Sequence, residues 1–70
     1  MIPLMMADVG QVFKIRKIGG SEKVRHHLLE MGFVVGAFVT VVASIDGSII
    51  VKVKESRVAI NSDMASKILV

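Results

Sequence analysis

The sequence predicts a mainly β fold with a small helical content, closed as a five-stranded barrel, with one helix near residues 21–31 and one helical turn near 62–65. Several short segments alternate apolar and polar residues, which is typical of strands with one buried face. Glycines stand between these segments and mark turns. Short antiparallel strands also leave edges that promote aggregation, and closing them into a barrel removes those edges.

Length and composition limit what such a protein can be. The 70 residues suffice for one small domain over residues 1–70, with 53% hydrophobic and 21% charged residues. A chain this apolar buries enough surface to fold, which excludes a disordered protein. The absence of cysteine excludes a disulfide scaffold, a thiolate zinc site and a cysteine nucleophile.

The first strand is expected over residues 11–18, where Phe13 and Ile15 alternate with basic residues and face the core. The alternation breaks at residues 17–18, so the strand bulges or ends there. Two glycines then make a turn that tolerates positive φ.

The helix is predicted over residues 21–31. Ser21 is a suitable N-cap, because its hydroxyl can accept a hydrogen bond from a free backbone N–H. Gly32 stands where a left-handed residue ends a helix. One face of the helix is apolar and is directed at the core; it consists of Val24, Leu28 and Met31.

Residues 39–45 and 49–54 are predicted to form a β-hairpin. The Asp-Gly pair between them favours a type I′ turn, which needs positive φ at both central positions. Every second residue of each strand is apolar and is expected to face the core. In the first strand these residues are Val39, Val41, Ala43 and Ile45.

A third strand of the second half covers residues 57–60. A helical turn then starts at Asn61 or Ser62 and ends at Ala65, and residues 67–70 form the last strand. The order strand, helix, three strands, helical turn and strand predicts a small SH3-like barrel whose longer helix plugs one end.

Three classes of protein are disfavoured. A membrane span needs about 20 consecutive mostly apolar residues, and charges or glycines interrupt every candidate. The apolar start lacks the cationic region of a signal peptide, so we expect a cytoplasmic protein with no membrane insertion. A domain this small has little volume for a deep pocket of about 300 Å³, so we expect no enzyme.

Three segments resemble the ferrous iron transport protein A (FeoA) family. Residues 28–36, LLEMGFVVG, are similar to the family's Leu-Leu-x-Leu-Gly-apolar-x-Pro-Gly segment. Residues 3–4 and 10–11 resemble the family's start. The end is also similar, through residues 56–60 and then Ala65, Ile68 and Val70. The order and spacing of the segments carry the resemblance, which covers nearly the whole chain.

The sequence departs from the family pattern in two places. Val35 stands where the family usually has proline, and residues 45–48 replace a longer connection.

The resemblance implies a small cytoplasmic accessory protein of bacterial and archaeal ferrous iron uptake, with no established catalytic residues. Its expected partner is the membrane permease FeoB, which carries a cytoplasmic GTP-binding domain. The same barrel resembles the C-terminal module of iron-dependent repressors, so the alternative is a metal-responsive or nucleic-acid-associated barrel. A third hypothesis is a structural protein that weakly self-associates.

The candidate partner-binding residues are Leu29, Phe33, Val34 and Val35. Leu29 lies about 100° round the helix from Leu28 of the core-facing stripe, and the other three stand between two glycines. Such residues either pack under a loop or form an exposed apolar patch for a partner. We expect this patch to contribute to docking.

His26, His27 and Glu30 are candidate ligands for a weakly bound divalent metal, iron or zinc. The two neighbouring histidines point about 100° apart on a helix and cannot chelate one ion together, whereas His26 and Glu30 can meet at i, i+4. Two ligands fall short of the four or so that zinc takes. The other interpretation is an ordinary polar helix face.

A basic strand surface is expected from Lys14, Arg16, Lys17, Lys52 and Lys54. Barrels that bind nucleic acids usually add aromatic side chains on which bases stack, and this chain has only three phenylalanines and neither tryptophan nor tyrosine. We interpret the basic residues as a solvated face and expect no nucleic-acid partner.

Overall fold

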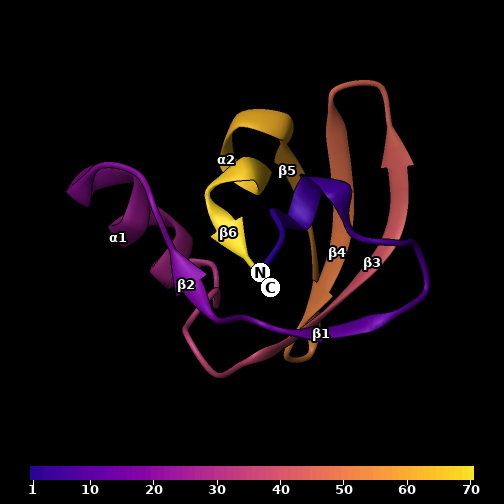
Figure 1. Ribbon diagram of the computed structural model, residues 1–70, viewed down its shortest axis with the longest axis horizontal. Helices are drawn as coiled ribbons and strands as arrows, with labels where there is room; N and C mark the ends of the chain where they lie inside the picture. Colours follow the sequence, from indigo (N-terminus) through magenta and orange to yellow (C-terminus); the bar gives the residue numbers. More distant parts are fainter.

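The structure is a computed structural model that describes residues 1–70. It is mainly β, with six short strands, two α-helices and one 3-10 turn (Figure 1). Neither helix is long and apolar enough to cross a lipid bilayer. In chain order the elements are η1 (Leu4–Met6), β1 (Val12–Lys14), β2 (Lys17–Ile18), α1 (Glu22–Glu30), β3 (Phe38–Ile45), β4 (Ser48–Val53), β5 (Ser56–Asn61), α2 (Ser62–Ser66) and β6 (Ile68–Leu69).

The strands form two antiparallel sheets, one of four strands in the order β1-β3-β4-β5 and one that pairs β2 with β6. The two ends of the chain lie side by side, because Ile2 and Val70 exchange backbone hydrogen bonds of 2.9 and 2.8 Å (Figure 1). The predicted SH3-like architecture is confirmed. Hydrogen bonds do not close the strands into one ring, however, so the expectation of a fully closed barrel is corrected.

The strand predicted over residues 11–18 is divided between the two sheets. The N–H of Ile15 donates to the carbonyl of Ala37 at 2.8 Å, while the N–H of Arg16 donates to the carbonyl of Leu69 at 2.8 Å. The chain therefore crosses from the larger sheet to the smaller one between these two residues. This crossing makes six strands instead of the five expected.

Thirteen apolar residues make the core, and no polar or charged side chain is buried. The 3-10 turn η1 and helix α2 pack on each other, and α2 also packs on β4, β5 and β6. The core residues are Leu4, Ile15, Leu28, Phe33, Val39, Val41, Ile49, Val51, Val53, Ile60, Ala65, Ile68 and Val70.

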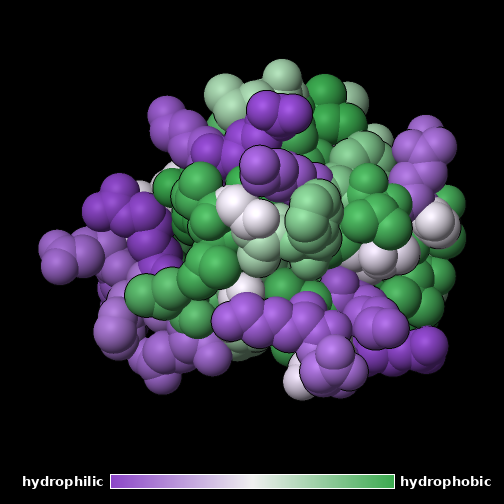
Figure 2. Space-filling model, turned by 90° about the horizontal axis from the view of Figure 1, so that it is seen from below, coloured by the Kyte–Doolittle hydropathy of each residue, from purple (hydrophilic) through white to green (hydrophobic).

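Helix α1 lies at one side of the molecule and does not plug the barrel, which corrects that expectation (Figure 1). Its caps are as predicted: the Ser21 hydroxyl accepts a hydrogen bond from the N–H of Val24 at 3.2 Å, and Gly32 follows with φ +103°. Only Leu28 of this helix is fully buried. A narrow apolar stripe on an otherwise charged helix can cover little of a core. On the face seen from below, the end of the molecule where α1 lies is mostly hydrophilic (Figure 2).

A β-bulge in β3 changes which residues face the core. The pairing with β4 shifts between Val41 and Ala43, so Val42 is an extra residue. One extra residue sends the following side chains to the opposite face. Ile45, predicted to face inward, is therefore 58% exposed.

The predicted β3–β4 hairpin is present, but its turn is not of type I′. Gly47 has φ +72°, whereas Asp46 has no positive φ. The next tight turn, between β4 and β5, contains Lys54 with φ +55°, the only residue other than glycine with positive φ. The predicted helical turn is α2, where the Asn61 side chain accepts a hydrogen bond from the N–H of Met64 at 2.8 Å.

Candidate docking site

The apolar residues predicted to bind a partner lie at the C-terminal end of α1 and in the loop after it. Leu29 is 52% exposed and Val35 is 64% exposed, while Val34 is half-buried. Phe33 is only 1% exposed and belongs to the core, so its inclusion in an accessible patch is corrected. We use the name helix-end patch for Leu29, Val34 and Val35.

The way α1 ends explains why Phe33 turns inward. The N–H of Gly32 donates to the carbonyl of Leu29, and the N–H of Phe33 donates to the carbonyl of Leu28, both at 3.0 Å. These two bonds form a Schellman motif, in which the residue after the glycine commonly packs on the last turn of the helix. Phe33 and Leu28 accordingly lie in the same core cluster.

Backbone hydrogen bonds hold the loop after α1 in place. The N–H of Gly36 donates to the carbonyl of Ile15 at 2.8 Å, and the N–H of Ala37 donates to the carbonyl of Val34 at 3.0 Å. Val35 therefore projects from an ordered turn. An apolar side chain presented in this way loses little conformational entropy when a partner covers it.

The metal candidates on α1 come together only in part. His26 Nε2 lies 2.8 Å from Glu30 Oε1, and no Lys or Arg side chain lies within salt-bridge distance of a carboxylate. His27 is exposed, and no three His, Asp or Glu side chains form a group that could hold a metal ion. His26 and Glu30 thus offer two ligands on an exposed helix, and a tightly held ion needs further ligands from a second molecule.

The basic residues of the strands are also divided. Three of them lie on the exposed side of the four-stranded sheet: Lys14 in β1, Lys52 in β4 and Lys54 directly after β4. The other two, Arg16 and Lys17, lie where the chain enters the smaller sheet.

Sequence reasoning missed Phe38, which is the first residue of β3 and is 65% exposed. Had the predicted strand started one residue earlier, Phe38 would have been expected on the outer face, because successive side chains of a strand point to opposite faces and Val39 points to the core.

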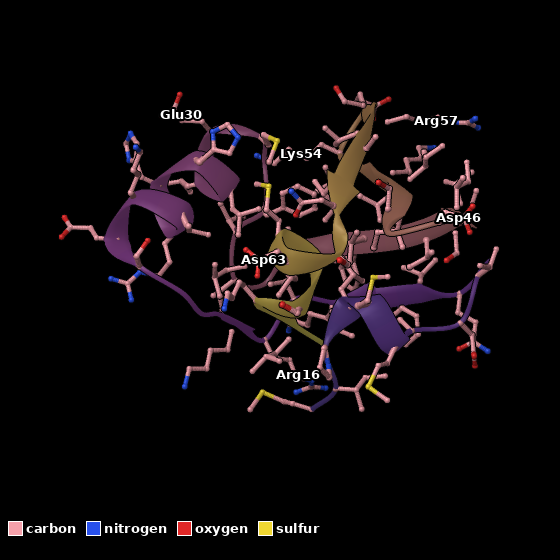
Figure 3. The ribbon with its side chains drawn as sticks, turned by 90° about the horizontal axis from the view of Figure 1, so that it is seen from above. Arg16, Glu30, Asp46, Lys54, Arg57 and Asp63 are labelled. Carbon is pink, nitrogen blue, oxygen red and sulfur yellow. The ribbon has the colours of Figure 1, made fainter.

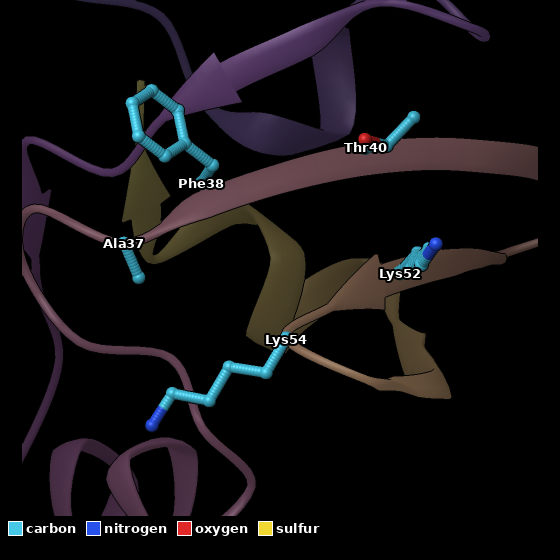
Figure 4. Close-up of a pocket in the computed structure, with 5 residues that line it drawn as sticks. All are labelled: Ala37, Phe38, Thr40, Lys52 and Lys54. Atoms are coloured by element: carbon cyan, nitrogen blue, oxygen red, sulfur yellow. The ribbon is translucent and has the colours of Figure 1, made fainter.

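A shallow depression of about 400 Å³ lies on this exposed side (Figure 4). It contains no carboxylate and no imidazole among its lining residues, so it offers no pair of groups for general acid–base catalysis. The lining residues are Ala37, Phe38, Thr40, Lys52 and Lys54.

A family model described as the FeoA domain matches residues 2–70. The chain belongs to the FeoA family. A Methanocaldococcus jannaschii protein named as an Fe(2+) transport protein A is 31% identical over 70 residues, which are the whole of this chain and 85% of the relative. The FeoA family is thereby connected with ferrous iron transport.

Solved structures show that the FeoA fold is shared closely. The crystal structure of an iron uptake regulatory protein (FeoA) superposes with a TM-score of 0.88 at 31% identity, covering 96% of this chain and 89% of the other. The solution structure of iron(II) transport protein A from Clostridium thermocellum gives 0.89 at 22% identity, covering 97% and 43%. A manganese-dependent transcriptional repressor gives 0.87 at 19% identity, covering 94% and 38%, and this likeness is one of fold alone.

Proposed function

We propose that this FeoA protein is a non-enzymatic cytoplasmic accessory of ferrous iron uptake, which docks on the cytoplasmic side of a FeoB-type permease and modulates it. Membership of the FeoA family supports the connection with iron transport. The open, shallow depression and its lining support a binding function over catalysis. An accessory of this kind changes the activity of a permease only if it binds two of the permease's conformations with different affinity.

The observation that carries the proposal is the exposure of Leu29 and Val35. These are branched apolar side chains with more than half of their surface in water. Apolar side chains that project from ordered backbone are suited to anchor an interface by filling a pocket of the partner. We therefore assign the docking contact to the helix-end patch.

The test compares two double variants of equal chemistry. Leu29→Asp with Val35→Asp places two carboxylates in the helix-end patch, while Met6→Asp with Val9→Asp makes the same change at exposed apolar residues of another segment. Affinity for the purified permease in lipid nanodiscs is measured by biolayer interferometry. We expect the first variant to bind at least about tenfold more weakly than wild type, because each desolvated carboxylate opposes binding, and the second to bind like wild type.

Equal binding by all three proteins would contradict the assignment of the patch. Absence of any binding by the wild type would contradict the docking function itself. Salt-dependent binding of the wild type to duplex DNA, together with no permease binding, would instead favour the alternative of a nucleic-acid-associated barrel.

A further inference from the structure

The outer side of the four-stranded sheet is a second exposed surface, and it is mainly basic, whereas the helix-end patch is apolar. The pairing of β1 with β3 puts Lys14 directly beside Phe38, and the pairings of β4 put Lys52 between Thr40 and Arg57. Phe38, Lys14, Lys52 and Arg57 are all exposed. We use the name sheet-face surface for Lys14, Phe38, Lys52, Lys54 and Arg57.

The sheet-face surface carries positive charge that is not paired with carboxylates. None of its four basic residues lies within salt-bridge distance of a carboxylate. Glu30 and Arg57 lie on opposite sides of the molecule (Figure 3). Glu55 follows Lys54 in the β4–β5 turn but is exposed and makes no ion pair with it.

One feature of this charge is unfavourable in the isolated protein. Lys52 and Arg57 are direct cross-strand neighbours, and like charges in that arrangement repel one another. A negatively charged ligand that contacts these side chains would relieve the repulsion. The surface therefore favours an acidic ligand.

The shape of the surface indicates that this ligand also has an apolar part. Ala37 and Phe38 line the depression where β3 begins, and Lys52 and Lys54 line it from β4 and the turn after β4, with side chains that extend in different directions (Figure 4). An apolar side chain can pack against the exposed phenyl ring while neighbouring carboxylates reach the ammonium groups. Acidic polypeptide with apolar residues at intervals has this chemistry.

A nucleic acid fits the surface less well. Single strands are bound by several aromatic side chains on which successive bases stack, and Phe38 is the only exposed aromatic residue here. Phosphate groups are recognised best by the planar fork of arginine, whereas three of the four cations are lysines.

We propose that the sheet-face surface docks an extended acidic segment of a partner polypeptide, with one apolar side chain of that segment packed on Phe38 and its carboxylates paired with Lys14, Lys52, Lys54 and Arg57. The inference rests on the proposed function only in naming the partner, which we take to be a cytoplasmic segment of the permease. The complementary charge of the segment supplies both the register and the salt dependence of the contact.

A synthetic peptide tests the surface without the permease. The probe is a fluorescein-labelled decapeptide in which glutamate alternates with leucine, and the control peptide has glutamine in place of glutamate. Fluorescence anisotropy is measured with the full-length protein and with two double variants of equal charge change. One is Lys52→Glu with Lys54→Glu, and the other is Lys23→Glu with Arg25→Glu on the exposed face of α1.

We expect the glutamate peptide to bind wild type and the α1 variant alike, and to bind the sheet-face variant at least about tenfold more weakly. Phe38→Ser should also weaken binding without unfolding the protein, because Phe38 is exposed. Equal weakening by the α1 variant, or no weakening by the sheet-face variant, would overturn the proposal. Tighter binding of a poly-dT oligonucleotide or of phosphatidylglycerol vesicles, lost in the sheet-face variant, would also overturn it in favour of those ligands.

The permease measurement separates this inference from the proposed function. Loss of permease affinity in the sheet-face variant supports the inference, and retention of full affinity there with loss in the Leu29→Asp, Val35→Asp variant overturns the inference alone. If wild type binds the glutamate peptide as expected but does not bind the permease, the proposed function fails while the acidic-peptide surface stands.

Discussion

Replacing Phe33 by alanine tests the burial that removes this residue from the docking surface. Its side chain is 1% exposed and is the largest of the fully buried side chains. Truncating a buried phenylalanine to alanine costs about 3–5 kcal/mol, since it removes apolar contacts and leaves a cavity. A domain is stabilised by about 0.05–0.15 kcal/mol per residue, or about 4–10 kcal/mol for this length. The variant should therefore lose at least about 30% of its free energy of unfolding.

The assay is urea unfolding followed by circular dichroism, because the chain has no tryptophan or tyrosine for fluorescence. Leu29→Ala is the matched control and should change the free energy of unfolding by no more than about 0.5 kcal/mol, since Leu29 is half exposed. Phe33→Leu keeps most of the volume and should cost less than about 1.5 kcal/mol, which gives a measurable protein if the alanine variant does not fold. A cost below about 1 kcal/mol for Phe33→Ala would refute the reasoning.

Three further predictions concern backbone conformation and metal binding. Lys54→Gly should raise the free energy of unfolding by about 1 kcal/mol in urea unfolding, because glycine adopts φ +55° without the steric cost; a loss of stability would contradict this. Gly32→Ala should lower the free energy of unfolding by about 1–2 kcal/mol. A Cβ at this position would meet Val53 at an ordinary contact distance, so the cost comes from φ +103°, which residues with a side chain avoid. An unchanged urea midpoint would count against the Schellman geometry. Calorimetric titration with zinc should show only weak binding at His26 and Glu30, because two side chains are too few ligands for a tight site. A tight site with one zinc per chain that is lost in His26→Ala would contradict this prediction.

Local signals predicted much of the fold. Ser21 and Asn61 cap their helices as short polar residues do, and Gly32 and Gly47 take the positive φ that their positions require. The alternation of apolar residues also identified all three buried positions of β4. These features depend on residues close in sequence, which is why they could be inferred without the structure.

The bulge at Val42 and the division of residues 11–18 between two sheets could not be predicted in this way. Both depend on which strand lies alongside, and pairing partners are distant in the chain. The exposure of Ile45 follows from the bulge and was missed for the same reason. Tertiary pairing commonly overrides a local pattern in strands.

The exposure of the candidate docking residues was predicted in part. Leu29 and Val35 are exposed as a docking surface requires, but Phe33 is in the core. A local signal for its burial was present, because an apolar residue after the glycine of a helix end usually packs on the helix. Phe38 was missed because the predicted strand began one residue late, and its basic neighbours lie on β1, β4 and β5.

Hydrogen exchange of the protein, read by mass spectrometry with and without the purified permease, tests most directly whether the end of α1 is the contact with the transporter. The expected result is slower exchange on complex formation for peptides that contain Leu29 and Val35, while peptides from η1 and the β3–β4 turn exchange at unchanged rates. Slowing confined to η1 or the β3–β4 turn, or no slowing anywhere at saturating permease, would contradict the account.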